Sequence, residues 1–264
     1  MWFALFLTFF AGMSTVFGGI LVTHRRMLSR GTLATALGFS AGAMLYVSFT
    51  DILQKSVGAF QRTESDKVAY AYMVSSFFVG ILIMVFLNRL IHRDINPNEQ
   101  EGVDQKTIRR NSKRRLLHSG LFIAAALCLH NFPEGFLVFM SALDDPSVGI
   151  AIAVALAIHN IPEGIAIAAP IYAASGKRLR TIGVAALAGI AEPIGAIIGY
   201  VILQDFLTNT VLGWTFGVVA GMMIFICIDE LLPAAKRYET SQYQTTYGFI
   251  AGMAVIAVSL AILI

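Results

Sequence analysis

The sequence carries little charge. Only 13% of its 264 residues are charged, 57% are hydrophobic, and the mean hydropathy is +0.73. A soluble domain of this length would need far more charge to cover its surface. Cysteine is also scarce: Cys128 and Cys227 are the only two, and no CxxC spacing indicates redox chemistry. We expect both to be small buried residues in helices, without a disulfide.

The apolar residues are gathered into eight runs of about 20 residues. As helices, such runs are long enough to cross a hydrocarbon core of roughly 30 Å. The sequence therefore predicts an all-α polytopic membrane protein with eight transmembrane helices. The expected helices cover 2–23, 31–53, 68–91, 116–141, 148–172, 181–203, 210–235 and 246–264.

Positive charge is unevenly distributed among the connections. Of the 19 Lys and Arg residues, 16 lie in alternate connections, and only Lys55, Arg62 and Lys67 lie in the opposite set. The positive-inside rule then places the loop 92–115 in the cytoplasm and both termini outside, which is the periplasm for an inner (cell) membrane. No Lys or Arg precedes the first run, so a cleaved signal peptide is not expected. The net charge of +3 comes from the Lys and Arg residues that orient the chain in the membrane, and no nucleic-acid partner is predicted.

Two segments near the N-terminus have counterparts of similar sequence in the second half of the chain, at nearly the same separation in residue number. Residues 38–53 match residues 217–232 at an offset of 179, with Gly, Ala, Gly, Met, an acid and Leu in common. At an offset of 177, Gly12, Thr15 and Gly18 correspond to Gly189, Glu192 and Gly195. This indicates a 3+2+3 inverted-repeat arrangement, typical of secondary transporters. The alternative is chance, because small residues recur at helix interfaces in membranes.

The hexapeptides 130–135 and 159–164 share the pattern H-N-x-P-E-G. Within each, His and Glu are four residues apart and lie on one helix face, and the proline releases a backbone carbonyl one turn back. An ionisable group at bilayer depth costs at least about 2.5–3.5 kcal/mol, which makes it a functional-site hypothesis. Imidazole with carboxylate suits Zn²⁺, Fe²⁺ or Co²⁺.

We therefore predict a metal site between the two central helices. Its candidate ligands are His130, Asn131, Glu134, His159, Asn160, Glu163, Glu192 and Met44. Met44 would add a soft thioether, but a methionine in an apolar helix is commonly a core residue. The other interpretation of each hexapeptide is a buried His–Glu pair that only fastens two helices. Two copies of the motif, and a third acid beside Pro193, favour the metal.

The paired hexapeptides, the A-E-P-x-G run at 191–195 and the G-M-M-I-F…D-E-L-L-P-A-A run at 221–235 resemble the ZIP family of divalent metal transporters, in particular its bacterial ZupT-like branch. The resemblance covers nearly the whole chain and implies one transporter domain, 1–264. It implies uptake of Zn²⁺, and also of Fe²⁺, Mn²⁺, Co²⁺ or Cd²⁺, through a binuclear centre. It further implies a homodimer in the lipid bilayer and an elevator-like movement of helices 1, 4, 5 and 6 against helices 2, 3, 7 and 8.

Carried onto this chain, the resemblance implies two ligand sets. The first site would use His130, Glu134, His159, Glu163 and Met44. The second would use Asn131, Asn160 and Glu192, with Glu134 and Glu163 bridging the two ions. The chain departs from many relatives in lacking a histidine-rich loop between helices 3 and 4. His159 stands where some relatives have an uncharged amide, which we expect to favour metals that bind nitrogen.

Two other classes of function are weaker. A membrane-embedded metallohydrolase would need a general base beyond its ligands, and the sequence has no HExxH motif. A metal-gated channel or sensor would be expected to carry a soluble output domain. We therefore expect no enzyme activity and no cofactor other than the transported metal.

Overall fold

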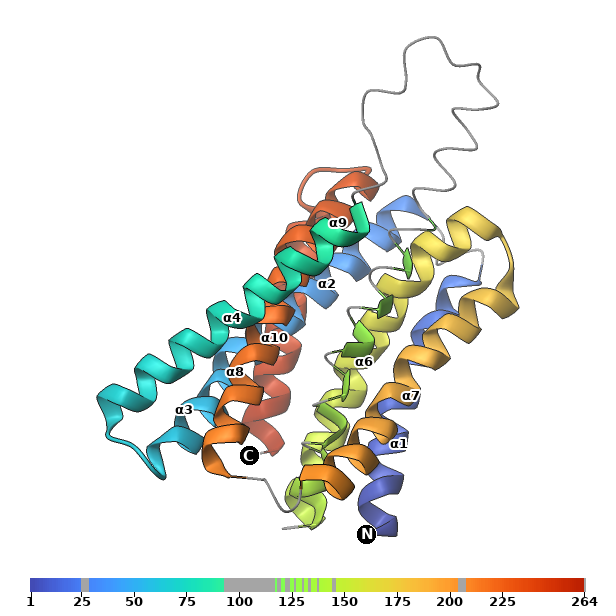
Figure 1. Cartoon of the computed structure of the whole chain (residues 1–264). Helices are drawn as coiled ribbons and strands as arrows, with labels where there is room; N and C mark the ends of the chain where they lie inside the picture. The colour runs from blue at the N-terminus through green and yellow to red at the C-terminus, as the bar shows by residue number, and fades with distance from the viewer. Residues whose placement is uncertain are drawn as a thin grey trace.

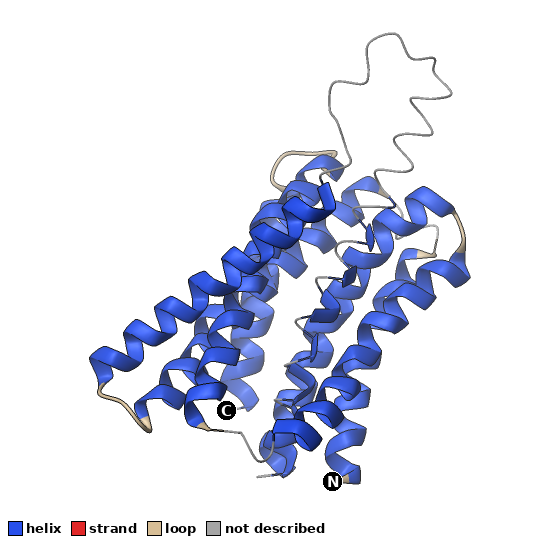
Figure 2. Cartoon of the chain, viewed as in Figure 1, coloured by secondary structure: helices blue, strands red, loops and turns tan. Residues whose placement is uncertain are grey.

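A computed structural model describes residues 1–24, 29–92, 146–203 and 208–263, and parts of the segment between them: 117, 120–121, 124–125, 127–129, 131–132, 134–136 and 138–143. These residues are helical apart from short connections, and none of them forms a strand (Figure 2). The helices lie roughly along one direction, and the two termini lie at the same end of the bundle (Figure 1).

Among the described residues, seven helical spans are long and apolar enough to cross a membrane, and a shorter apolar helix covers Leu127–Leu143. The fold class, an all-α polytopic membrane protein, is confirmed. The count of eight spans stays a prediction, because the fourth expected helix is described only in part. The elements are α1 (Trp2–Val22), α2 (Arg30–Val47), η1 (Ser48–Ile52), α3 (Leu53–Gln61), α4 (Asp66–His92), α6 (Pro146–Ser175), α7 (Arg178–Leu203), α8 (Asn209–Ile226), η2 (Cys227–Leu231), α9 (Leu232–Tyr238) and α10 (Gln244–Leu263).

The second expected helix, 31–53, ends later than the sequence predicts. After α2 the chain passes through the π-helical segment η1 and continues as α3 to Gln61. Residues 53–61 are too polar for a hydropathy argument, but they are amphipathic: Ser56 and Phe60 are buried, whereas Gln54 is exposed. Ser56 Oγ donates to the carbonyl oxygen of Gly213 at 2.7 Å, which ties α3 to α8.

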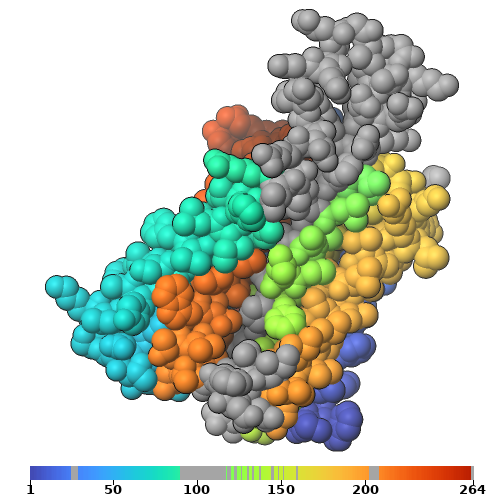
Figure 3. Space-filling view, viewed as in Figure 1, coloured from blue at the N-terminus to red at the C-terminus, as the bar shows by residue number. Residues whose placement is uncertain are grey.

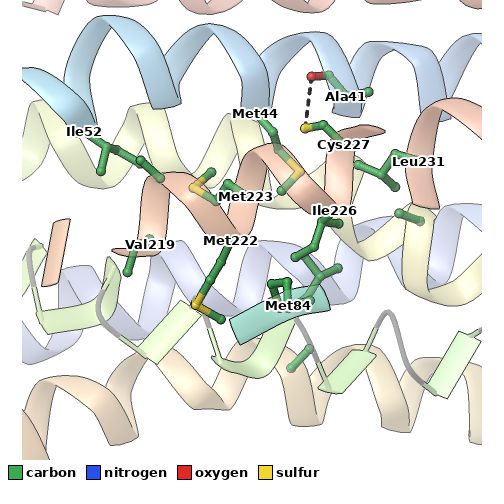
Figure 4. Close-up of a cluster of buried hydrophobic side chains, with 14 of the residues drawn as sticks. Ala41, Met44, Ile52, Met84, Val219, Met222, Met223, Ile226, Cys227 and Leu231 are labelled. Carbon is green, nitrogen blue, oxygen red and sulfur yellow. Dashed lines mark hydrogen bonds between the residues drawn. The ribbon is translucent and has the colours of Figure 1, made fainter. Parts of the chain in front are cut away.

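The helices form two groups. The helices α1, α6 and α7 pack together on one side, and α2, α3, α4, α8 and α10 pack on the other (Figure 1). A buried apolar cluster lies where the two groups meet, through α2, α8 and η2 on one side and α6 on the other. Figure 4 shows part of this cluster, with the side chains of Met44, Met223 and Cys227 between the helices.

The segments α2–η1 and α8–η2 correspond along their whole length. Ser29 and Thr208 are equivalent at the offset of the repeat, and they cap α2 and α8 by accepting the N–H groups of Thr32 and Val211. The π-helical segments Ser48–Ile52 and Cys227–Leu231 correspond at the same offset. Because π-helical turns are rare, their recurrence at the predicted offset supports the inverted repeat over chance.

Matching glycines hold each of these segments against its neighbour. A Cβ atom on Gly42 would lie 2.0 Å from the Phe249 carbonyl oxygen, and one on Gly221 would lie 2.0 Å from that of Phe77. Only glycine permits such an approach of two helix backbones. In Figure 1, α2 and α8 run in opposite directions, as the inverted repeat requires.

The outer helices α4 and α10 present apolar side chains outward. They are the least buried of the seven spans, and α4 exposes Phe78, Leu82 and Phe86. Figure 3 shows α4, in teal, at the edge of the molecule with its side chains uncovered along its length. Such a surface suits the acyl chains of a bilayer, since lipid tails do not penalise exposed apolar groups.

We expect Gly42→Ala to destabilise the bundle by about 1–3 kcal/mol, because the added methyl group would push α2 away from α10. Thermal unfolding in detergent would measure the change. Gly183→Ala in α7 is the control, since nothing lies within 4 Å of a Cβ at that position. Equal midpoints for the two variants would contradict the close helix contact.

Candidate metal centre

Five polar residues predicted as ligands are buried in one group of helices. Asn160 and Glu163 lie on α6, Glu192 lies on α7, and Asn131 and Glu134 lie on the Leu127–Leu143 helix. None has more than 3% of its surface exposed. Carboxylates are almost never buried to this degree unless they are paired or bind a cation.

The two asparagines make matching contacts with the helices on either side. Asn160 Nδ2 donates to the carbonyl oxygen of Ala11 at 2.9 Å, and Asn131 Nδ2 donates to that of Ala188 at 3.2 Å. Asn131 and Asn160 are equivalent in the hexapeptides, and Ala11 and Ala188 are equivalent at the offset that relates α1 to α7. The contacts of the two amides therefore agree with the predicted inverted repeat.

These contacts fix the orientation of both amides. A backbone carbonyl only accepts hydrogen bonds, so each asparagine must turn its NH₂ group towards it. Both Oδ1 atoms then point the other way, and both are buried without a hydrogen-bond partner in the described part of the chain. A buried neutral oxygen held in this way is a suitable ligand for a divalent cation.

Glycine and proline shape the backbone around the site. A Cβ atom on Gly164 would lie 1.9 Å from the Thr15 carbonyl oxygen, and one on Gly135 would lie 2.0 Å from that of Glu192. The two glycines therefore let the hexapeptide helices touch α1 and α7 directly. Pro162 lies inside α6 and cannot donate to the carbonyl of Ile158, which leaves that oxygen available.

The site brings several negatively charged groups close together. Glu134 and Glu163 are both close enough to repel a negative charge on Glu192. Glu192 accepts a short hydrogen bond from Asn160 Nδ2, whereas its Oε2 atom is buried without a partner among the described residues. Three acidic groups in a medium of low dielectric need protons or a cation for balance.

The two predicted histidine ligands lie outside the described part of the structure. This holds for all of His130 and for the side chain of His159, although the backbone of His159 belongs to α6. Among the side chains that are described, no group of three or more His, Cys, Asp or Glu is arranged to hold a metal ion. The ligand roles of the eight candidates therefore stay predictions.

Met44 is fully buried. Its side chain lies within the apolar cluster that joins α2 to α8 (Figure 4). Its sulfur lies 4.0 Å from Ser40 Oγ, and the sulfur of its repeat partner Met223 lies 3.7 Å from Ser48 Oγ. Met44 thus belongs to the core of the opposite helix group, and its role as a ligand stays a prediction. Both cysteines are free, and Cys227 is buried in the same cluster as predicted, whereas Cys128 is only partly buried.

The sequence motifs did not reveal the backbone acceptors on α1 and α7. The carbonyl groups of Ala11 and Ala188 carry no side-chain signature, so a motif search has nothing to find. The offset of 177 was the available signal, because it relates the α1 segment around Ala11 to the α7 segment around Ala188.

A bundle of apolar helices around a buried set of amides and carboxylates defines a multi-pass membrane protein with a polar centre. The family model of the ZIP zinc transporters matches residues 96–260. Zinc transporters ZupT of Corynebacterium aurimucosum and Stenotrophomonas maltophilia are 45% and 40% identical to the chain over 99% of its length and 97% and 96% of theirs. That of Oceanobacillus iheyensis is 44% identical over 98% of the chain and 97% of its own length. The chain belongs to the ZIP zinc transporter family.

We expect Glu192→Gln to raise the unfolding temperature of the metal-free protein, because it removes one repelling charge and keeps an acceptor for Asn160. Zinc at about 100 times its Kd would stabilise the wild-type protein by about 2.7 kcal/mol, and the variant should gain much less at the same concentration. Thermal unfolding with a chelator and with Zn²⁺ measures both effects. An unchanged zinc response in the variant would remove Glu192 from the site.

Proposed function

We propose that the protein carries divalent transition-metal ions, Zn²⁺ foremost, across the cell membrane into the cytoplasm. The observation that carries this proposal is the burial of three glutamates, with two oriented amides, inside a membrane-spanning bundle. Membership in the ZIP family and the names of the relatives support the same cargo. Fe²⁺, Mn²⁺, Co²⁺ and Cd²⁺ belong to the proposed range because the donor set mixes nitrogen and oxygen.

Two cations would occupy the centre. The first would bind His130, His159, Glu134 and Glu163, with Met44 reaching in from α2. The second would bind Asn131, Asn160 and Glu192 and share the two bridging glutamates. The shared carboxylates would hold the two ions close together, and the described donors other than Met44 belong to α6, α7 or the Leu127–Leu143 helix.

The division into two groups supports an elevator-like movement. The group that holds almost all donors packs against α2, α8 and η2 through apolar side chains, which can slide without breaking ion pairs. The other group would be the scaffold and, through the exposed faces of α4 and α10, the interface of a homodimer. The mass of the protein in nanodiscs would separate one copy from two.

We favour transport over catalysis. The donors come from helices related by an inverted repeat, an arrangement that serves access from two sides of a membrane and has no use in hydrolysis. We therefore propose that the protein is not an enzyme and that the metal is its cargo. Zinc-dependent hydrolytic activity of the purified protein would contradict this proposal.

We expect Glu163→Gln to lower Zn²⁺ uptake into proteoliposomes at least tenfold, because a bridging carboxylate is lost. Uptake of radiolabelled zinc measures the effect. Glu64→Gln is the control, since Glu64 is exposed in the turn between α3 and α4. Wild-type uptake by the Glu163 variant would count strongly against a shared site.

The charge distribution supports an orientation with both termini outside. We expect a cysteine introduced at Ser65, in the turn before α4, to react with a membrane-impermeant maleimide on intact cells. A cysteine at Ser241, in the turn before α10, should react only after the cells are opened. Both positions are exposed, and the wild-type chain gives the background from Cys128 and Cys227. The reverse pattern would invert the proposed direction of transport.

A further inference from the structure

Thr15 of α1 is a buried polar residue that no ligand set above includes. Its side chain is fully buried, and Oγ1 has no hydrogen-bond partner in the described part of the chain. Buried threonines in these helices commonly donate to the carbonyl oxygen four residues back. Thr8 does so to Ala4 at 2.9 Å, and Thr181 does so to Lys177 at 3.0 Å.

Thr15 is denied this local partner because the Ala11 carbonyl oxygen is already in use. That oxygen accepts the helical N–H of Thr15 itself. It also accepts Ser14 Oγ at 2.6 Å and Asn160 Nδ2 at 2.9 Å. The Thr15 hydroxyl is therefore left for another group, since a buried hydroxyl without a partner is costly.

The position of Thr15 relates it to Glu192. The two residues correspond at the offset between α1 and α7 and occupy equivalent places in the inverted repeat. A Cβ atom on Gly12 would lie 3.2 Å from the carboxyl carbon of Glu192, and one on Gly189 would lie 3.5 Å from Cβ of Thr15. Both side chains therefore lie at the crossing of α1 and α7, beside the candidate metal centre.

The two halves of the centre differ in one respect. On one side, Asn160 is hydrogen-bonded to Glu192. On the equivalent side the corresponding residues are Asn131 and Thr15, and Thr15 Oγ1 is without a hydrogen bond among the described residues. A neutral hydroxyl group thus stands where the other half has a carboxylate.

We propose that Thr15 Oγ1 is a further oxygen donor to the divalent cation in this centre, from the position on α1 that corresponds to Glu192 on α7. The inference rests on the proposed transport function. A hydroxyl in place of a second carboxylate adds a hard ligand without adding negative charge to a cluster that already holds three glutamates. Hard oxygen ligands favour Mn²⁺ relative to Cd²⁺, so Thr15 affects selectivity as well as affinity.

The test compares Thr15→Val with Thr15→Ser in the full-length protein. We expect Thr15→Val to weaken Mn²⁺ binding and uptake roughly tenfold or more, with a smaller effect on Cd²⁺. Thr15→Ser should stay close to wild type, because it keeps the hydroxyl. Thr8→Val is the matched control: it removes another buried hydroxyl of α1, one that is satisfied within the helix.

Calorimetry with Mn²⁺ and with Cd²⁺ on purified protein, followed by uptake into proteoliposomes, gives the two readouts. Equal losses for both metals in Thr15→Val, or losses no larger than in Thr8→Val, would overturn the proposal. If Thr15→Val does not fold, Thr15→Cys is the second variant, and it should shift the preference towards Cd²⁺ because a thiolate is soft. Failure of the wild-type protein to transport either metal would contradict the proposed function, while the calorimetry would still test Thr15.

Discussion

The structure depends on the burial of acidic and amide side chains between closely packed helices. The site is built where the hexapeptide helices touch α1 and α7 through glycine, and the same approach lets Asn131 and Asn160 reach backbone carbonyls of those helices. The same helix contacts therefore determine both the packing of the helices and the position of the candidate ligands. A change that moved α1 away from α6 would also release the Asn160 amide and, with it, the contact to Glu192.

Much of this arrangement follows from the sequence. Apolar runs located the spans because a helix in lipid must bury its own backbone polar groups, and this constraint leaves a strong hydropathy signal. The hexapeptides identified Asn131, Glu134, Asn160 and Glu163 as buried polar residues, and burial of all four is what the structure shows. The repeat offsets, read from small residues, correspond to helix caps, π-helical segments and glycine contacts.

Other features had no readable signal. The extension to Gln61 was missed because α3 is amphipathic and packs on protein along one face, so that its mean hydropathy resembles that of a loop. The π-helical turns depend on tertiary packing and have no composition of their own. Met44 shows the limit of ligand prediction from residue type, because its thioether is equally suited to the apolar cluster in which it lies.

The paired π-helical segments have a consequence for sequence comparison and engineering. A π turn contains one residue more than an α-helical turn, so the chain beyond it is rotated by about 100° relative to an uninterrupted helix. Deleting a single residue within Ser48–Ile52 would remove the extra residue, restore regular hydrogen bonding and keep Phe60 directed towards Trp214, whose ring it meets edge-on at 6.4 Å. A one-residue gap in this region of an alignment is therefore compatible with the same buried helix face.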